Sequence, residues 1–247
     1  MKTSTLLSAL PFLGLASALP YVQARDVSSD STSDATISAT ISLQQAASMG
    51  KVETLNSISA LEAAADPVNE NGLSGACKAV TVLYAKGTGE NGNMGDGSSP
   101  GPAWVAAIRA SLGTDKVAVQ GIEYDASVLG YLLGGSPSGS TTYLNTINQA
   151  STQCPSTKIV VGGYSQGAQI LHNAAEKLTA AVTAKIAAVV VFGDPDYPDA
   201  VGNVPASKTN QICHTGDIIC TGRGGADAHL TYAKDAPAAA AFVVARV

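Results

Sequence analysis

The sequence predicts an α/β fold, a three-layer α/β/α sandwich built on a mostly parallel central sheet. Three observations lead to this class. The chain of 247 residues is 45% hydrophobic, which is ample for a sizeable buried core. Short runs rich in Val, Ile and Ala show no polar alternation, a pattern typical of strands buried on both faces. These runs alternate with helical stretches, and that order implies parallel strands with helices on both sides of the sheet.

The expected elements follow in chain order from these two patterns. Four apolar runs predict strands at residues 80–85, 117–124, 158–164 and 186–192. Helical stretches between and after them predict helices at residues 103–112, 141–153 and 166–182. A last helix at 236–247 would close the domain, which we expect to span residues 72–247.

The N-terminus has the features of a secretory signal peptide over residues 1–18. Lys2 supplies the positive charge, residues 6–15 form an apolar run broken by Pro11, and Ala16-Ser17-Ala18 fits the small-x-small cleavage rule. The apolar run is shorter than the roughly 20 residues of a membrane span, and no later segment reaches that length. We therefore expect a secreted, extracellular protein without a membrane span.

Residues 19–71 differ in composition from the rest of the chain. Residues 26–42 are rich in Ser, Thr and Asp and contain no aromatic residue, so they cannot bury enough surface to offset the entropy of ordering. We interpret 19–71 as a propeptide or flexible N-terminal segment. Helical spacing of apolar residues at 43–65 indicates a helix outside the main domain.

Charge and cysteine content narrow the classes of partner and cofactor. Lys and Arg total 14 against 19 Asp and Glu, so no basic surface is expected that could neutralise the phosphates of nucleic acid. The even cysteine count fits an oxidising compartment, and spacing favours Cys77–Cys154 and Cys213–Cys220 disulfides. No clustered His/Cys ligands occur in the sequence, so no metal site is expected. A monomer without metal or organic cofactor is expected.

A glycine-rich stretch after the first predicted strand formally matches a dinucleotide-binding fingerprint. Residues 87–92 read Gly-Thr-Gly-Glu-Asn-Gly, the G-x-G-x-x-G pattern. That fingerprint requires the last glycine to open a helix, whereas glycines and prolines continue to residue 102. Glu123, the acidic residue after the second strand, also lies too far along the chain. The stretch is therefore interpreted as a loop that does not bind a dinucleotide.

A second motif points to nucleophilic catalysis. Residues 163–167 read Gly-Tyr-Ser-Gln-Gly, a G-x-S-x-G motif at the passage from an apolar strand into a helix. In that context the glycines permit the sharp turn of a nucleophile elbow, which exposes Ser165 Oγ at the carboxyl end of a sheet of the α/β-hydrolase type. A serine hydroxyl is a weak nucleophile and needs a histidine base and an orienting carboxylate.

Spacing leaves two choices for that base and carboxylate. His172 lies about two helical turns beyond Ser165 and cannot reach its hydroxyl. Ser165 could act with Asp194 and His214, or with Asp217 and His229. Because a short disulfide loop would hold Asp217 rigidly, the second choice is favoured but not fixed.

Three motifs together resemble the fungal cutinase family of secreted serine esterases, which is related to acetylxylan esterases. They are the G-x-S-x-G elbow, the Cys-His-Thr-Gly-Asp-Ile-Ile-Cys segment at 213–220, and His-Leu-Thr-Tyr at 229–232. The resemblance covers residues 77–247 and implies Ser165 as nucleophile, Asp217 as acid and His229 as base. It also implies an oxyanion hole from the backbone N–H groups of Thr88 and Gln166.

The substrate implied by this resemblance is a carboxylic ester, nominally plant cutin. Cutinases usually carry large aliphatic residues just before the base, whereas residues 223–228 read Arg-Gly-Gly-Ala-Asp-Ala. Less apolar area there predicts a preference for short acyl chains. The apolar cluster at 128–133 is either the opposite wall of the crevice or ordinary core. An acetylxylan esterase and a non-catalytic secreted effector or wall-binding protein remain the alternatives.

Overall fold

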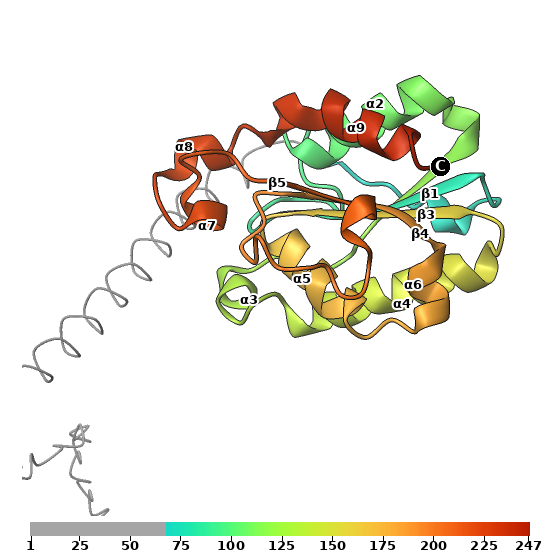
Figure 1. The fold of residues 1–247 in the computed structure, drawn as a ribbon, viewed down its shortest axis with the longest axis horizontal. Coiled ribbons are helices and arrows are strands. Elements are labelled where there is room, and N and C mark those ends of the chain that lie inside the picture. The colour runs from blue at the N-terminus through green and yellow to red at the C-terminus, as the bar shows by residue number, and fades with distance from the viewer. Residues whose placement is uncertain (1–67) are drawn as a thin grey trace, which may run out of the picture. The chain divides into compact units, whose positions relative to one another are not determined.

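The centre of the protein is a five-stranded parallel sheet (Figure 1), seen in a computed structural model that describes residues 68–247. Its spatial order is β2-β1-β3-β4-β5, and every neighbouring pair is parallel. The strands are β1 (Val80–Ala85), β2 (Val117–Gly121), β3 (Lys158–Tyr164), β4 (Ile186–Phe192) and β5 (Thr209–Ile212). The predicted signal peptide, nearly all of the predicted 19–71 segment and the predicted helix at 43–65 lie outside the described residues.

Three strands have the bounds that the sequence predicts. β1, β3 and β4 are almost wholly buried, as expected for strands covered on both faces. β2 ends at Gly121 rather than residue 124, because it is an edge strand and its only partner, β1, ends one residue beyond the Tyr84–Gly121 pair. β5 was not predicted: its sequence Thr-Asn-Gln-Ile is mostly polar, since it is an edge strand and only half-buried.

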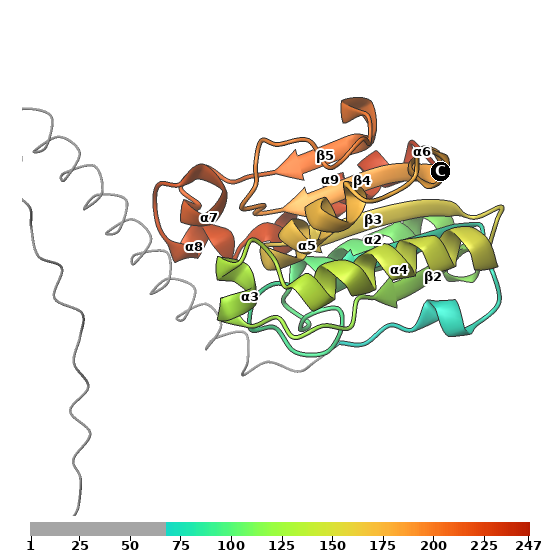
Figure 2. The same cartoon turned by 90° about the horizontal axis from the view of Figure 1, so that it is seen from below.

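Helices cover both faces of the sheet, which confirms the predicted sandwich (Figure 2). α2 (Pro100–Leu112) and α9 (Ala236–Val244) pack on one face. α4 (Pro137–Gln153), α5 (Gln166–Ala175) and α6 (Ala180–Lys185) lie on the other. Three short helices, α3 (Val128–Leu132), α7 (Ile218–Thr221) and α8 (Ala226–His229), lie beyond the carboxyl ends of the strands.

The predicted helix at 166–182 is in fact two helices. α5 ends at Ala175, and α6 begins after Thr179, whose hydroxyl accepts a hydrogen bond from the N–H of Val182. A threonine cap of this kind satisfies a free N–H group at a new helix start, so the chain turns instead of continuing. Single 3-10 turns at Gly72–Ser74, Thr114–Lys116, Ala206–Lys208 and Tyr232–Asp235 complete the described elements.

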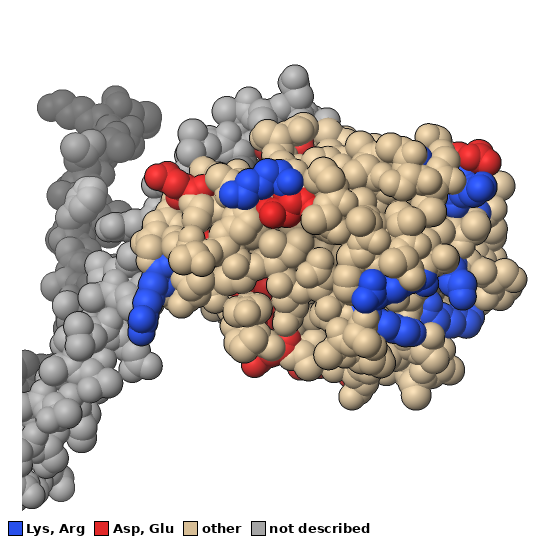
Figure 3. All heavy atoms as spheres, turned by 45° about the horizontal axis from the view of Figure 1, so that its top comes forward, with Lys and Arg blue, Asp and Glu red and all other residues tan. Residues whose placement is uncertain are grey.

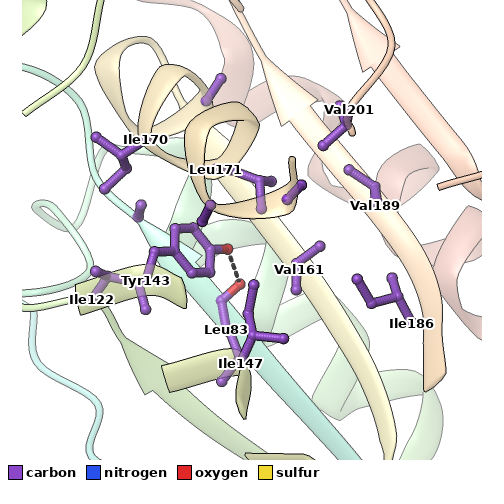
Figure 4. Packing of buried hydrophobic residues seen from close by; sticks show 14 of the residues in the cluster. Leu83, Ile122, Tyr143, Ile147, Val161, Ile170, Leu171, Ile186, Val189 and Val201 are labelled. Carbon is purple, nitrogen blue, oxygen red and sulfur yellow. Dashed lines mark hydrogen bonds between the residues drawn. The ribbon is translucent and has the colours of Figure 1, made fainter. Parts of the chain in front are cut away.

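Side chains of alternate strand residues form a core on each face of the sheet. Figure 4 shows part of the face that carries α4 and α5, where Tyr143 packs among Leu83, Ile147 and Val161. The Tyr143 hydroxyl donates to the carbonyl of Leu83 at 3.0 Å, so the one polar atom of this ring is satisfied inside an apolar cluster. The core thus fixes the ends of the strands, where the candidate site lies.

Covalent and terminal contacts complete the domain. The predicted disulfides Cys77–Cys154 and Cys213–Cys220 are both present. Residues 68–71, which the sequence assigns to the N-terminal segment, pair with the domain: the N–H of Val68 donates to the carbonyl of Gly95 at 2.8 Å. No helix within residues 68–247 has both the length and the apolar character needed to cross a membrane.

Candidate active site

Ser165 lies in the turn that joins β3 to α5. Its φ of 52° and ψ of −121° make it the one non-glycine residue with positive φ in the described part of the chain. Strained serines of this kind mark nucleophile elbows. A Cβ on Gly163 would lie 2.4 Å from the carbonyl oxygen of Gly167, and one on Gly167 would lie 2.1 Å from that of Ala85. Both glycines are therefore required for the turn.

His229 and Asp217 form a fully buried pair beside this turn. His229 ends α8, and its Nδ1 lies 2.8 Å from Asp217 Oδ2. Asp217 caps α7, accepting the N–H of Ile219 at 2.8 Å on its other oxygen. The Tyr232 hydroxyl also donates to Asp217 Oδ2, at 2.6 Å. Burial alone would raise the pKa of Asp217, but these hydrogen bonds, that of His229 foremost, outweigh it and hold the pKa below its usual value.

Packing fixes the imidazole of His229 close to the elbow. The ring stacks on Tyr164, the residue before Ser165, with centroids 4.9 Å apart. It also covers Gly193, whose added Cβ would lie 2.7 Å from His229 Cε1. The N–H of Ser165 donates to the carbonyl of Phe192, next to Gly193, at 3.0 Å. With Nδ1 held by Asp217, Nε2 is left without a hydrogen-bond partner within residues 68–247 and is free to accept a proton.

The glycine-rich loop at 87–92 packs against the start of α5. Gln166, the first residue of α5, donates through Nε2 to Thr88 Oγ1 and to the carbonyl of Ser127, each at 2.9 Å. The first N–H groups of a helix have no acceptor within the helix and can meet a developing negative charge. The loop can lie this close to Tyr164 only because residue 87 is a glycine, since a Cβ there would lie 2.7 Å from the Tyr164 ring.

A buried carboxyl group that sequence reasoning missed braces this loop. Glu90 accepts the N–H of Gly87 on one oxygen and the hydroxyl of Ser99 on the other. Burial, the largest influence, raises the pKa of Glu90 to about 7. Glu90 stands inside the false dinucleotide motif, and nothing in that motif shows that its side chain turns inward. A long-range contact of this kind has no local sequence signal.

The alternative base and acid are each paired with other residues. His214 Nε2 lies 2.7 Å from Asp235 Oδ2, and its ring stacks on Tyr232 with centroids 4.0 Å apart. Asp194 Oδ2 lies 2.9 Å from His172 Nε2. The structure thus brings Asp217 together with His229, whereas Asp194 and His214 do not pair with each other.

His172, Asp194 and Asp196 are the one described group with metal-ligand spacing, their ligand atoms lying within 4.8 Å of one another. Burial works against a charged ring, but the bond to Asp194 and nearby carboxylates outweigh it and raise the pKa of His172. The hydrogen bond between His172 Nε2 and Asp194 Oδ2 ties α5 to the loop after β4.

Exposed leucines flank the site on α3. Leu129, Leu132 and Leu133 are 65%, 53% and 62% exposed, while Tyr131 turns inward onto Ile219 of α7. Within the 128–133 cluster the three leucines are therefore surface residues, whereas Tyr131 is buried core. Tyr164, His229 and Leu230 line a cavity of about 270 Å³ together with Asp96, Ser98, Ser99 and Pro100.

A parallel sheet that presents a serine at a strand-to-helix turn, beside a buried His–Asp pair, is the arrangement of an α/β hydrolase. The family model that matches the chain, described as Cutinase, covers residues 76–247. The chain belongs to the cutinase family, and with it to the carboxylic ester hydrolases.

Similar proteins agree with this assignment. The cutinase of Blumeria hordei is 52% identical over 243 residues, which span 98% of this chain and 99% of that relative. The solved structure of Trichoderma reesei cutinase in complex with a C11Y4 phosphonate inhibitor is 39% identical with a TM-score of 0.69, and the match covers 82% of this chain and 96% of that one. An acetylxylan esterase, 22% identical with a TM-score of 0.58 over 69% and 99% of the two chains, shares the fold. The resemblance predicted from the motifs is confirmed.

Proposed function

We propose that the protein hydrolyses esters by a two-step acyl-enzyme route with Ser165 as nucleophile, His229 as base and Asp217 as orienting acid. The observation that carries this is the buried His229–Asp217 pair, whose imidazole packs on Tyr164 of the elbow and on Gly193, the residue after β4. Because Asp217 holds Nδ1, the free Nε2 is the atom that takes the proton.

Both steps use only Ser165, His229, two backbone N–H groups, the ester and one water molecule. His229 Nε2 takes the hydroxyl proton of Ser165 as Oγ attacks the ester carbonyl. The backbone N–H groups of Gln166 and Thr88 stabilise the oxyanion of the tetrahedral intermediate. The ester C–O bond breaks, and the alcohol leaves with the proton from His229. Water then attacks the acyl-enzyme by the same sequence and releases the carboxylic acid.

For the substrate we propose cutin-type polyesters, with a preference for short acyl groups. Residues 223–225 are exposed and offer no aliphatic side chain to hold a long one. The exposed leucines of α3 suit contact with an apolar polymer around the scissile bond. Secretion, expected from residues 1–18, would bring the enzyme to such a polymer.

A chain-length series of p-nitrophenyl esters, with cutin and acetylxylan alongside, tests both parts. Ser165→Ala, Asp217→Ala and His229→Gln should each lower kcat on the order of 10⁴-fold or more, because a triad acts as a unit. The matched control His214→Gln should retain most activity. Equal inactivity of the wild type and Ser165→Ala on every ester would favour a non-catalytic wall-binding protein. Highest kcat/KM on a sixteen-carbon ester would refute the short-chain preference. Release of acetate from acetylxylan without release of monomers from cutin would show that acetylated polysaccharide, and not cutin, is the substrate.

A further inference from the structure

A hollow at the opposite end of the sheet gathers positive charge. It has a volume of about 490 Å³ and lies where β3, β4 and β5 begin. Four cationic side chains from separate segments line it, and no carboxylate side chain does: Lys158, Lys185, Lys208 and Arg246. Figure 3 shows Lys and Arg side chains gathered at this end of the molecule. A net charge of −5 for the whole chain does not exclude this local clustering of positive charge.

None of these four charges is neutralised by an ion pair within residues 68–247. Lys185 donates to the carbonyl of Ser151 at 2.8 Å and Lys208 to that of Ile186 at 2.7 Å. Arg246 donates to the carbonyls of Ser207 and Phe242. Backbone carbonyls hold these side chains in place but leave each positive charge uncompensated, and an ammonium group keeps donors to spare.

The charges form part of a row along the sheet edge. A lysine stands just before or at the start of every strand, and in the spatial order of the strands these are Lys116, Lys78, Lys158, Lys185 and Lys208. Neighbouring strands lie about 4.8 Å apart, so the five lysines leave the backbone at successive positions along this edge of the sheet. Asp115 is the one acidic residue in the four positions before each strand.

We propose that this basic edge, defined by the five lysines and Arg246, binds a linear polyanion, namely an acidic polysaccharide that carries repeated carboxylate groups. A single small anion would gain little in so open a hollow, because exposed charges interact weakly in water. A chain with regularly placed carboxylates can engage the whole row and release many counterions.

The other side chains of the hollow favour a sugar polymer over other polyanions. Ser156 and Ser207 are exposed and offer hydroxyl groups suited to sugar hydroxyls, and no aromatic ring lines the hollow on which a nucleic-acid base could stack. The large apolar side chains that the described part exposes follow the strands or lie on α3, at the end that carries Ser165. The basic edge therefore lacks the apolar anchors of a membrane-binding surface.

Binding at this edge would orient the enzyme. Acidic side chains follow the strands at the other end, among them Glu123, Asp125 and Asp196. A polyanion is repelled there and attracted to the basic edge, so the site around Ser165 would face away from the bound chain and stay open to an ester. The basic edge is therefore a tethering surface and not a subsite for the ester, and its role does not depend on the proposed catalytic chemistry.

The test is retardation of the full-length protein in native gels that contain polygalacturonate, with neutral dextran as the blank. Retardation should appear at about 10 mM salt and vanish at about 1 M, where the Debye length falls to about 3 Å. The double variant Lys158→Gln/Lys185→Gln should raise the Kd about five-fold for each charge removed. The control Arg223→Gln/Lys234→Gln makes the same charge change near the other end of the strands and should bind like the wild type.

A second variant guards against a folding artefact. The Lys158 ammonium makes no hydrogen bond in the described structure and its side chain is exposed, so Lys158→Glu should leave the unfolding temperature unchanged while weakening retardation. Lys234→Glu is its control. Absence of retardation in the wild type, or equal losses in the test and control variants, would overturn the proposal. Equal affinity for single-stranded DNA or for anionic phospholipid vesicles would overturn the assignment to a polysaccharide.

Discussion

Removing the hydroxyl of Tyr232 tests how Asp217 is held. That hydroxyl donates to Asp217 Oδ2 at 2.6 Å and accepts the N–H of His214 at 2.9 Å. Tyr232→Phe keeps the ring, which is buried between Phe192 and His214, and deletes the oxygen alone. The carboxylate loses one of its donors, and a backbone N–H loses its acceptor.

These two losses differ in magnitude and in pH dependence. A hydrogen bond to a charged group contributes about 1.5–3 kcal/mol, and an unsatisfied buried N–H costs about 1–3 kcal/mol. We expect the free energy of unfolding of Tyr232→Phe to fall by about 3–5 kcal/mol at pH 7. We also expect kcat to fall with little change in KM, by less than the about 10²-fold that a full 1 Å displacement of a catalytic group costs, because Asp217 keeps its hydrogen bonds to His229 and Ile219.

The sign of the pH dependence follows from the lowered pKa of Asp217. A group whose pKa is lower in the folded state contributes stability above its unfolded pKa, and that contribution disappears as the pH falls through the folded pKa. Tyr232→Phe raises the folded pKa of Asp217, so its contribution is smaller and is lost at a higher pH. The destabilisation relative to the wild type should therefore shrink by roughly 1–2 kcal/mol between pH 5 and pH 3.

Urea unfolding across this pH range, with Tyr143→Phe as the matched control, measures the effect. The Tyr143 hydroxyl is equally buried but bonds the neutral carbonyls of Leu83 and Gly162, so its loss should be independent of pH. A destabilisation by Tyr232→Phe that stayed constant from pH 7 to pH 3, parallel to that of Tyr143→Phe, would show that the hydroxyl does not stabilise the charge on Asp217. Unchanged kcat would refute its role in positioning.

Three further changes have distinct expected outcomes. Gly193→Ala places a Cβ within 2.7 Å of the His229 ring and should lower kcat about 10²-fold while the protein stays folded by circular dichroism. Glu90→Gln removes a carboxyl group whose folded-state pKa is raised from 4.5 to about 7, so in the wild type its contribution to stability is present below pH 4.5 and is lost as the pH rises through 7. Relative to the wild type, the variant's free energy of unfolding should therefore rise by about 3 kcal/mol between pH 4 and pH 8 in urea titrations. A difference between the two proteins that did not change with pH would contradict this. Replacing Cys77 and Cys154 by Ala opens a loop of sequence separation 77 and should cost about 4.5 kcal/mol of unfolding free energy, with kcat largely retained.

The parts of the fold that the sequence predicts are those set by local pattern. β1, β3 and β4 could be bounded to the residue because burial on both faces leaves an uninterrupted apolar run. β5 escaped prediction because its place at the edge permits Thr, Asn and Gln. The sequence did not predict α3, because a helix of five residues with exposed leucines shows no amphipathic period.

In the candidate site, too, local motifs could be predicted and contacts made by the tertiary fold could not. Ser165 could be found because its elbow is a contiguous motif, whereas the choice between Asp194 and Asp217 depends on which histidine each carboxylate meets after folding. Tyr232 stands inside a motif that the sequence brings to attention, yet its bond to Asp217 spans 15 residues and no spacing rule predicts it. The inward turn of Glu90 is likewise a product of the tertiary fold.

Strand order explains why a glycine follows β4. Ser165 follows β3 and Asp217 follows β5, with β4 between them, so the two residues leave the sheet edge about two strand spacings, roughly 10 Å, apart. In the proposed triad, the imidazole of His229 lies across the end of β4 between the carboxylate and the serine. A side chain on the residue that follows β4 would occupy the same space: a Cβ added to Gly193 would lie 2.7 Å from His229 Cε1. The distance between β3 and β5 thus explains why His229 comes from another element, α8, rather than from either strand end. It also explains why residue 193, which the imidazole covers, is a glycine.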